Sequence, residues 1–250
     1  MRSPGPKKNE LRPHRVLRWV IAPEASAAFV ARMEDILDLY SEPYDLSRPV
    51  VCMDEMPVGL VSASREPLPA IPGSCAKEDY EYVRHGSASV FGALDLKGGT
   101  RLLQVSERRA GVDFARFLQR LADEIFPWAQ TIRLVLDNLS THNKGSFYEA
   151  FDPAQARRLA MRFEFHYTPT HGSWLNAVEL EFAAAKTQCL QARMGTIKEL
   201  AEHLDAWQKN RNERKVGVRW NFDTTVARTK LKRIYPQQAN PDQPCPEVDK

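Results

Sequence analysis

The sequence predicts a mixed α/β fold, in which a sheet with antiparallel and parallel strands is flanked by helices. Short apolar runs separated by turn residues fill residues 50–105, which is typical of an antiparallel meander. Over residues 111–126 the apolar spacing changes to three and four residues, which indicates a helix. Strands and helices then alternate from residue 132 onward, as they do when helices cover the faces of a sheet.

Length and composition limit the classes of protein to consider. The chain has 250 residues, 43% hydrophobic and 27% charged, which describes one large or two small folded domains. Apolar runs stay far below the roughly 20 residues of a membrane span, and none follows the basic start of the chain as in a secretory signal. The four cysteines have no metal-knuckle spacing. We therefore expect a cytoplasmic protein that does not enter the membrane.

The first part of the chain is predicted to be a basic arm and one helix. Residues 1–18 carry six lysines and arginines against one glutamate, with three prolines and no sustained periodicity, so we expect an irregular arm. Apolar residues recur at helical spacing over 24–40, behind Pro23 at a favourable helix start. Pro43 and Pro49 bracket a linker.

The remaining elements follow from the same patterns. The meander is predicted from five runs, with a proline-rich loop at 67–72 and a turn at Gly98 and Gly99: residues 50–53, 58–62, 80–84, 88–96 and 101–105. After the helix over 111–126, we expect strands at 132–136 and 163–167 and helices at 153–161, 173–190, 197–211 and 223–234.

Positive charge is concentrated toward the two ends of the chain. The formal net charge is only +3, yet residues 208–235 carry nine lysines and arginines against two acids, and the centre of the chain is net negative. Basic flanks around an acidic centre are typical of a protein that binds a polyanion, although solvated charged faces give the same pattern. The candidates for contacts with DNA phosphates are Lys209, Arg211, Arg214, Lys215, Arg219, Arg228, Lys230, Lys232 and Arg233.

Two acids follow apolar strands and are the first candidates for a functional site. Asp54 follows residues 50–53, and Asp137 follows residues 132–136. Ligands of open α/β sheets bind beyond the carboxyl ends of strands, so acids on neighbouring parallel strands would face one site. Carboxylates held close together repel each other, and a divalent cation such as Mg²⁺ or Mn²⁺ offsets that repulsion. Either aspartate alone is equally compatible with the start of a turn.

A third acid is expected on the helix predicted over 173–190. Glu179 and Glu181 flank the apolar face of that helix on opposite sides. Periodicity leaves both open as the third carboxylate.

Three segments together resemble the DDE transposases of bacterial insertion sequences in the Tc/mariner superfamily. They are VCMDE at 51–55, LVLDNLSTH at 134–142 and HYTPTHGSWLNAVE at 166–179. The third is the most specific, because Pro, Trp-Leu-Asn and Glu stand at the spacing found around the last catalytic acid of the superfamily. The resemblance extends from about residue 20 to residue 235.

The resemblance implies a ribonuclease H-like fold with Asp54, Asp137 and Glu179 as catalytic acids and metal ligands. It implies two Mg²⁺ or Mn²⁺ ions, cleavage of DNA at transposon ends and strand transfer into target DNA. A homodimer in a synaptic complex is the expected active species. Relatives carry helix-turn-helix modules upstream, so a separately encoded N-terminal half is a possible partner. The alternatives are a catalytically silent DNA-binding remnant and a ribonuclease H-like nuclease with another role.

Five further residues within the resembling segments are expected to support the acids. His142 and His171 are candidates for contacts with a phosphate or a carboxylate, although a loop histidine is also common as polar surface. Trp174 is suited to stack on an unpaired base or to pack its helix onto the sheet. Asn138 and Asn176 complete the set, with Asn176 expected to fix its loop.

The domain organisation expected from these patterns has four parts. Residues 1–45 form the basic arm and linker helix, and 46–192 form the ribonuclease H-like DDE domain. Residues 193–235 form basic helices, and 236–250 form a disordered tail. The expected location is the cytoplasm of a bacterium, in association with the nucleoid.

Overall fold

A computed structural model describes residues 26–236, which contain one five-stranded sheet in the order β3-β2-β1-β4-β5. β1, β2 and β3 are antiparallel, whereas β1, β4 and β5 run parallel. The predicted mixed sheet is therefore confirmed. The arm over 1–18 and the tail beyond 236 lie outside the described residues. The strands are β1 (Val50–Ala63), β2 (Tyr82–Asp95), β3 (Arg101–Ser106), β4 (Ile132–Leu136) and β5 (Phe163–Tyr167).

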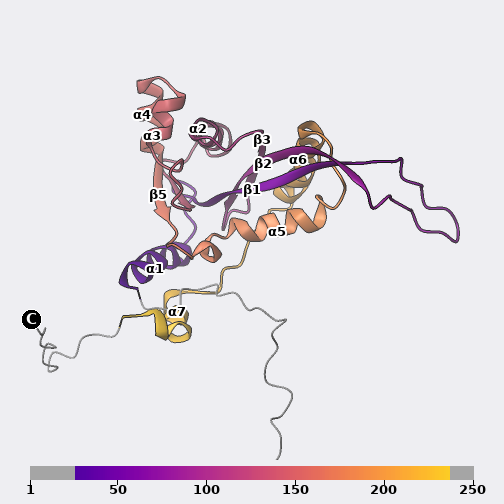
Figure 1. The fold of residues 1–250 in the computed structure, drawn as a ribbon. Helices are drawn as coiled ribbons and strands as arrows, with labels where there is room; N and C mark the ends of the chain where they lie inside the picture. Colours follow the sequence, from indigo (N-terminus) through magenta and orange to yellow (C-terminus); the bar gives the residue numbers. More distant parts are fainter. Residues whose placement is uncertain (1–25, 237–250) are drawn as a thin grey trace, which may run out of the picture.

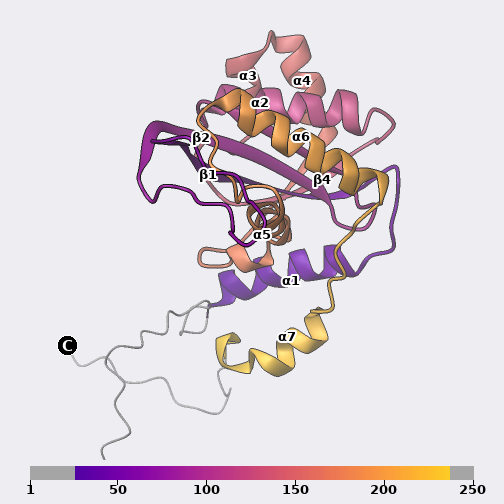
Figure 2. The same ribbon diagram turned by 90° about the vertical axis from the view of Figure 1, so that its right-hand side faces the viewer.

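Helices cover both faces of this sheet (Figures 1 and 2). The α-helices are α1 (Ala27–Ser41), α2 (Gly111–Arg120), α3 (Gly145–Ala150), α4 (Pro153–Arg162), α5 (Val178–Gln188), α6 (Ile197–Glu213) and α7 (Thr224–Lys230). A π-helical turn, Leu121–Ile125, extends α2, and 3-10 turns are formed by Ser173–Leu175 and Lys232–Ile234. None of the helices within 26–236 has the length and apolar character needed to cross a membrane.

Two apolar cores hold these layers together. One core joins α1, α5 and α6 to one face of the sheet, and the other joins α2, α3 and α4 to the opposite face. Alternate residues of β1 divide between the cores, because Cys52 belongs to the first and Val51 and Met53 to the second. Since Asp54 continues this alternation, its side chain lies on the α5 side of the sheet.

The first hairpin is longer than predicted. The prediction placed breaks between strands at residues 54–57 and 85–87, and both breaks were wrong. Asp54 pairs with Gly92 and Pro57 with Ser89, so β1 and β2 form one long hairpin. β4 pairs with β1 only as far as Cys52, so β1 is an edge strand at Pro57, and edge strands tolerate proline. Figure 1 shows this hairpin extending far beyond the helices. The short helix α3 was not predicted.

The segment before α5 is not the continuous helix predicted over 173–190. A 3-10 turn ends at Leu175, and Asn176 has extended backbone angles (φ −83°, ψ 102°) before α5 begins at Val178. The buried Asn176 side chain donates from Nδ2 to the carbonyl oxygen of Met53 at 2.8 Å. The helix is interrupted because this asparagine is bonded to β1 instead of continuing the turn.

α5 approaches the sheet closely at one glycine. Gly92 lies in β2 opposite Asp54, and a Cβ atom at this position would overlap the ring of Phe182. Phe182 is a buried residue of α5. The absence of a side chain at residue 92 therefore allows α5 to lie directly against the strand pair that carries Asp54.

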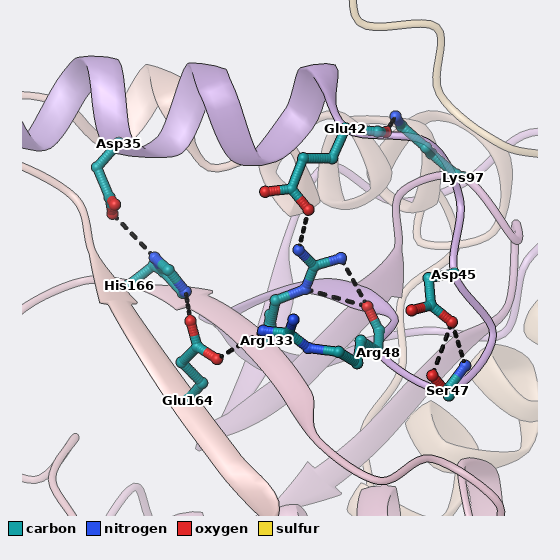
Figure 3. A network of polar contacts seen from close by, with 9 residues as sticks. All are labelled: Asp35, Glu42, Asp45, Ser47, Arg48, Lys97, Arg133, Glu164 and His166. Carbon is teal, nitrogen blue, oxygen red and sulfur yellow. Dashed lines mark hydrogen bonds and ion pairs between the residues drawn. The ribbon is translucent and has the colours of Figure 1, made fainter.

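A polar network joins α1 to the parallel half of the sheet (Figure 3). The buried Arg133 guanidinium donates to the carbonyl oxygen of Arg48 from Nε (3.1 Å) and Nη2 (2.8 Å) and pairs with Glu42 beyond the end of α1. His166 on β5 lies between two carboxylates, with Nδ1 2.8 Å from Asp35 and Nε2 3.0 Å from Glu164. These contacts hold α1 against β4 and β5.

Candidate functional site

Two acids lie close together where the parallel pairing of β1 with β4 stops. The strand register pairs Cys52 with Val135, and two residues further along it sets Asp54 beside Asp137. Both side chains are partly buried. Asp137 follows the carboxyl end of β4, as expected, whereas the expectation for Asp54 was wrong, because β1 continues past it to Ala63.

The two glutamates left open by periodicity lie in different surroundings. Glu179, in the first turn of α5, is exposed and lines a cavity of about 300 Å³ together with Asp54, Glu55 and Lys186. Glu181 is buried and forms ion pairs with Arg101 at 2.8 Å and Arg211 at 2.6 Å. Glu179 shares the cavity of Asp54, whereas Glu181 is neutralised inside the protein.

Asp54 is the carboxyl group most affected by its surroundings. Burial raises its pKa to about 7, and the negative charges of Asp137, Glu179 and Glu55 add to this effect. The backbone N–H of Glu55 donates to Asp54 Oδ1 at 2.7 Å and acts in the opposite direction. A cation close to Asp54 would offset the repulsion that raises this pKa.

His142 bonds two carboxylates, one of the two roles that the sequence suggested for it, although Glu55 was not expected as a partner. Its buried ring lies with Nδ1 2.5 Å from Asp137 Oδ1 and Nε2 2.9 Å from Glu55 Oε1, and it stacks on Phe114. Burial opposes the charged form, but the bonds to Asp137 and Glu55 outweigh it and raise the pKa of His142 to about 9. Carboxylates only accept hydrogen bonds, so both ring nitrogens donate at neutral pH.

The other supporting residues have varied surroundings. Trp174 packs edge-on against Phe222 with ring centroids 5.6 Å apart. Asn176 fixes the chain between Trp174 and α5 to β1, next to Asp54. Asn138 is exposed, and His171 lies in the exposed loop before the 3-10 turn.

The donor set has the chemistry of a site for a hard divalent cation. Asp54, Asp137 and Glu179 offer carboxylate oxygens only, which suits Mg²⁺ or Mn²⁺. Among residues 26–236, no three His, Cys, Asp or Glu side chains lie close enough together to hold a metal ion as they stand. The residues therefore fit such an ion in type and charge, and binding would require them to move closer together.

A comparison with known protein families identifies the family of this chain. The family described as DDE superfamily endonuclease matches residues 49–201, which include all three acids. The chain belongs to the DDE superfamily of endonucleases. The resemblance seen in the sequence is thereby confirmed, and a comparison with curated proteins gave no match.

Solved structures of a transposase share the fold of this DDE endonuclease. The Mos1 mariner paired end complex with Mn matches with a TM-score of 0.52 at 16% identity, over 83% of this chain and 63% of that chain. The Mos1 transposase paired-end complex with left transposon end matches with a TM-score of 0.50 at 16% identity, over 91% of this chain and 66% of that chain. The Mos1 strand transfer complex matches with a TM-score of 0.50 at 16% identity, over 83% of this chain and 65% of that chain. The DDE endonuclease chain thus has the ribonuclease H-like fold and spans less than two thirds of these relatives.

The basic residues of the DDE endonuclease are not equally available to a ligand. Arg211 is held by Glu181, and its guanidinium also lies 4.9 Å from the ring of Trp207. Arg228 on α7 forms two hydrogen bonds with Glu34 but stays exposed. The side chains that are exposed also include Lys209, Arg214, Lys215, Arg219, Lys230, Lys232 and Arg233.

Proposed function

We propose that this DDE endonuclease is the catalytic part of a transposase, which cuts DNA at transposon ends and transfers the cut strands to target DNA. One observation carries the proposal: Asp54 in β1 lies near Asp137, just beyond the end of β4, and shares a cavity with Glu179. The DDE family membership and the likeness to Mos1 paired-end and strand transfer complexes support it.

The proposal gives the three acids the role of metal ligands. Asp54, Asp137 and Glu179 would together hold two Mg²⁺ or Mn²⁺ ions. When bound, such ions activate the attacking oxygen and stabilise the leaving oxygen of a phosphodiester. The raised pKa of Asp54 is consistent with this role, because burial and, to a lesser degree, the neighbouring carboxylates disfavour its charge, and a bound cation offsets both effects.

The protein's own part is to hold these carboxylates in position. Asp137 is bonded to His142, which is bonded in turn to Glu55. Asn176 fixes the start of α5 to the carbonyl group beside Asp54, and so limits the movement of Glu179. Hydrogen bonds to ligand side chains set their orientation and commonly affect metal affinity tenfold or more.

The substrates and partners belong to the same proposal. DNA would lie over the site formed by Asp54 and Asp137. Residues 46–192 would be the DDE domain, and the basic helices at 193–235 would contact DNA phosphates. Two copies would pair two transposon ends, and a separate helix-turn-helix chain would supply recognition of the ends. The cytoplasm, at the bacterial nucleoid, is the proposed location.

The test uses the full chain, divalent metal and a supercoiled plasmid that carries the DNA flanking its gene. We expect the wild type to nick the plasmid, and Asp54→Asn and Asp137→Asn to lose that activity while remaining folded. Glu107→Gln is the matched control, because Glu107 is exposed and has no recorded partner within the described chain. Full nicking by both aspartate variants would contradict the proposal.

The same assay separates the alternatives. Binding to DNA without any cleavage, even with a helix-turn-helix partner supplied, would indicate a silent remnant. Preferential cleavage of RNA–DNA hybrids would indicate a nuclease with another role.

A further inference from the structure

A second cavity lies on the other side of the loop that leads to α5. It has a volume of about 370 Å³ and is formed between the start of α1 and the loop at 169–171. Its described lining contains no acid, and its four polar side chains, of Ser26, Arg32, Thr170 and His171, are all able to donate hydrogen bonds. The lining residues are Ser26, Ala28, Phe29, Arg32, Pro169, Thr170 and His171.

The two strongest donors of this cavity have no protein partner within residues 26–236. Arg32 and His171 are exposed, and neither forms a recorded hydrogen bond or ion pair. The acids nearest to Arg32 along α1 have other partners, since Glu34 bonds Arg228 and Asp35 bonds His166. The Arg32 guanidinium is thus left to a ligand.

The backbone at His171 is strained in a way that points to function. Its φ of 63° is in the left-handed region, which residues other than glycine rarely adopt. A turn in which the N–H of Gly172 donates to the carbonyl oxygen of Pro169 at 2.8 Å holds this conformation. Such strain persists where the surrounding structure imposes it, and it is common at ligand sites.

We propose that the Arg32–His171 cavity binds a DNA phosphate beside the phosphate that is cut. This inference rests on the proposed function, and it names a contact outside both the acids and the basic C-terminal helices. His171 lies in the loop that leads to α5, eight residues before Glu179 in the first turn of that helix, so a strand held at His171 would continue toward the acidic cavity. Arginine binds phosphate oxygens through two parallel N–H groups, and hydroxyl and imidazole groups add further donors.

The first experiment measures binding of the full chain to a DNA duplex at several salt concentrations. Loss of one phosphate contact lowers the slope of log affinity against log salt by about 0.9. We expect Arg32→Ala to show this change and Arg32→Lys to keep most of the wild-type slope. Arg157→Ala is the matched control, because Arg157 is also an exposed helical arginine without a recorded partner, on α4 across the sheet.

His171→Gly tests the second donor without disturbing the fold. Glycine adopts a positive φ without strain, so we expect an unchanged or raised melting temperature together with weaker DNA binding. Wild-type affinity in this variant would show that the side chain of His171 takes no part.

The second experiment locates the phosphate. A series of duplexes is prepared in which one phosphate at a time is replaced by a neutral methylphosphonate. At one position the replacement should weaken DNA binding by the wild type and leave DNA binding by Arg32→Ala unchanged. Equal salt slopes for Arg32→Ala and Arg157→Ala, in a protein that still cleaves DNA, would overturn the phosphate site alone. A wild type that neither binds nor cleaves DNA would overturn both proposals.

Discussion

Two glutamates on one helix show how the same side chain takes different roles. Glu179 and Glu181 are two residues apart in the first turn of α5. Glu181 is buried between Arg101 and Arg211, so its charge is compensated twice. Glu179 is exposed beside Asp54, Asp137 and Glu55, which bear charge of the same sign.

The difference separates an acid held in buried ion pairs from the acid that we propose as a metal ligand. A buried charge is tolerated only when it is paired and hydrogen-bonded, and Glu181 meets this condition. Within residues 26–236, Glu179 has no cation paired with it of the kind that neutralises Glu181, and its negative charge is one of those that raise the pKa of Asp54. We therefore expect substitutions at the two glutamates to affect different properties.

The largest effect is expected at Glu179. Glu179→Gln removes a proposed metal ligand from an exposed position, so DNA cleavage should fall by about a thousandfold or more, while the stability stays within about 0.5 kcal/mol of wild type. Plasmid nicking and urea unfolding measure the two quantities. Cleavage at the wild-type rate would remove Glu179 from the site.

The next effect is expected at Glu181, and in stability. Glu181→Ala leaves the buried Arg101 without its carboxylate, which should cost about 3–5 kcal/mol in the free energy of unfolding. Urea unfolding measures this loss. A stability equal to that of Glu179→Gln would mean that the buried ion pairs contribute nothing and that the comparison fails.

A smaller effect is expected at Asp54 and depends on pH. The folded-state pKa of about 7 lies above the ordinary value of 3.8, so between these values the folded protein holds a proton that the unfolded chain has lost. Ionisation of Asp54 therefore lowers stability as pH rises from about 4 to 7. With a chelator present, the advantage of Asp54→Asn over wild type in the free energy of unfolding should grow by about 2 kcal/mol across this range. This is less than the free energy that corresponds to the whole pKa shift, because Asp54 is partly in contact with solvent.

Thermal unfolding at a series of pH values checks this prediction, with Glu107→Gln as the control. Parallel curves for Asp54→Asn and wild type would contradict it. Added Mn²⁺ should stabilise the wild type more at pH 8 than at pH 6, because the metal competes with a proton for Asp54.

The smallest effect is expected at an exposed ion pair. Arg228 and Glu34 join α7 to α1 through two hydrogen bonds, but the arginine side chain is 63% exposed. Arg228→Ala should therefore change the free energy of unfolding by less than about 1 kcal/mol. Urea unfolding gives the value, and a loss as large as that of Glu181→Ala would mean that burial does not decide the strength of these pairs.

The sequence predicted the sheet and two of its acids because local patterns specify them. The apolar runs before Asp54 and Asp137 form the start of β1 and all of β4, and the parallel pairing of these two runs brings the two acids close together. The length of the first hairpin was missed because Pro57 is unfavourable within a strand, and only the sheet order shows that it lies on an edge.

The surroundings of the acids depend on long-range contacts that local patterns do not contain. Glu55 and His142 meet from separate parts of the chain, so a loop histidine gave no sign that it is buried between two acids. Likewise, Arg101 on β3 and Arg211 on α6 reach Glu181 only in the folded protein. Periodicity located the two glutamates, and tertiary structure distinguishes them.

Gly92 gives the molecule a simple means of adjustment. Because the ring of Phe182 occupies the space that a side chain there would need, a methyl group at residue 92 would force this buried ring to move, and we expect α5, which carries both Phe182 and Glu179, to shift with it. The distance between Asp54 and Glu179, which are 125 residues apart in the sequence, thus depends on Gly92 in β2, a strand that carries neither acid.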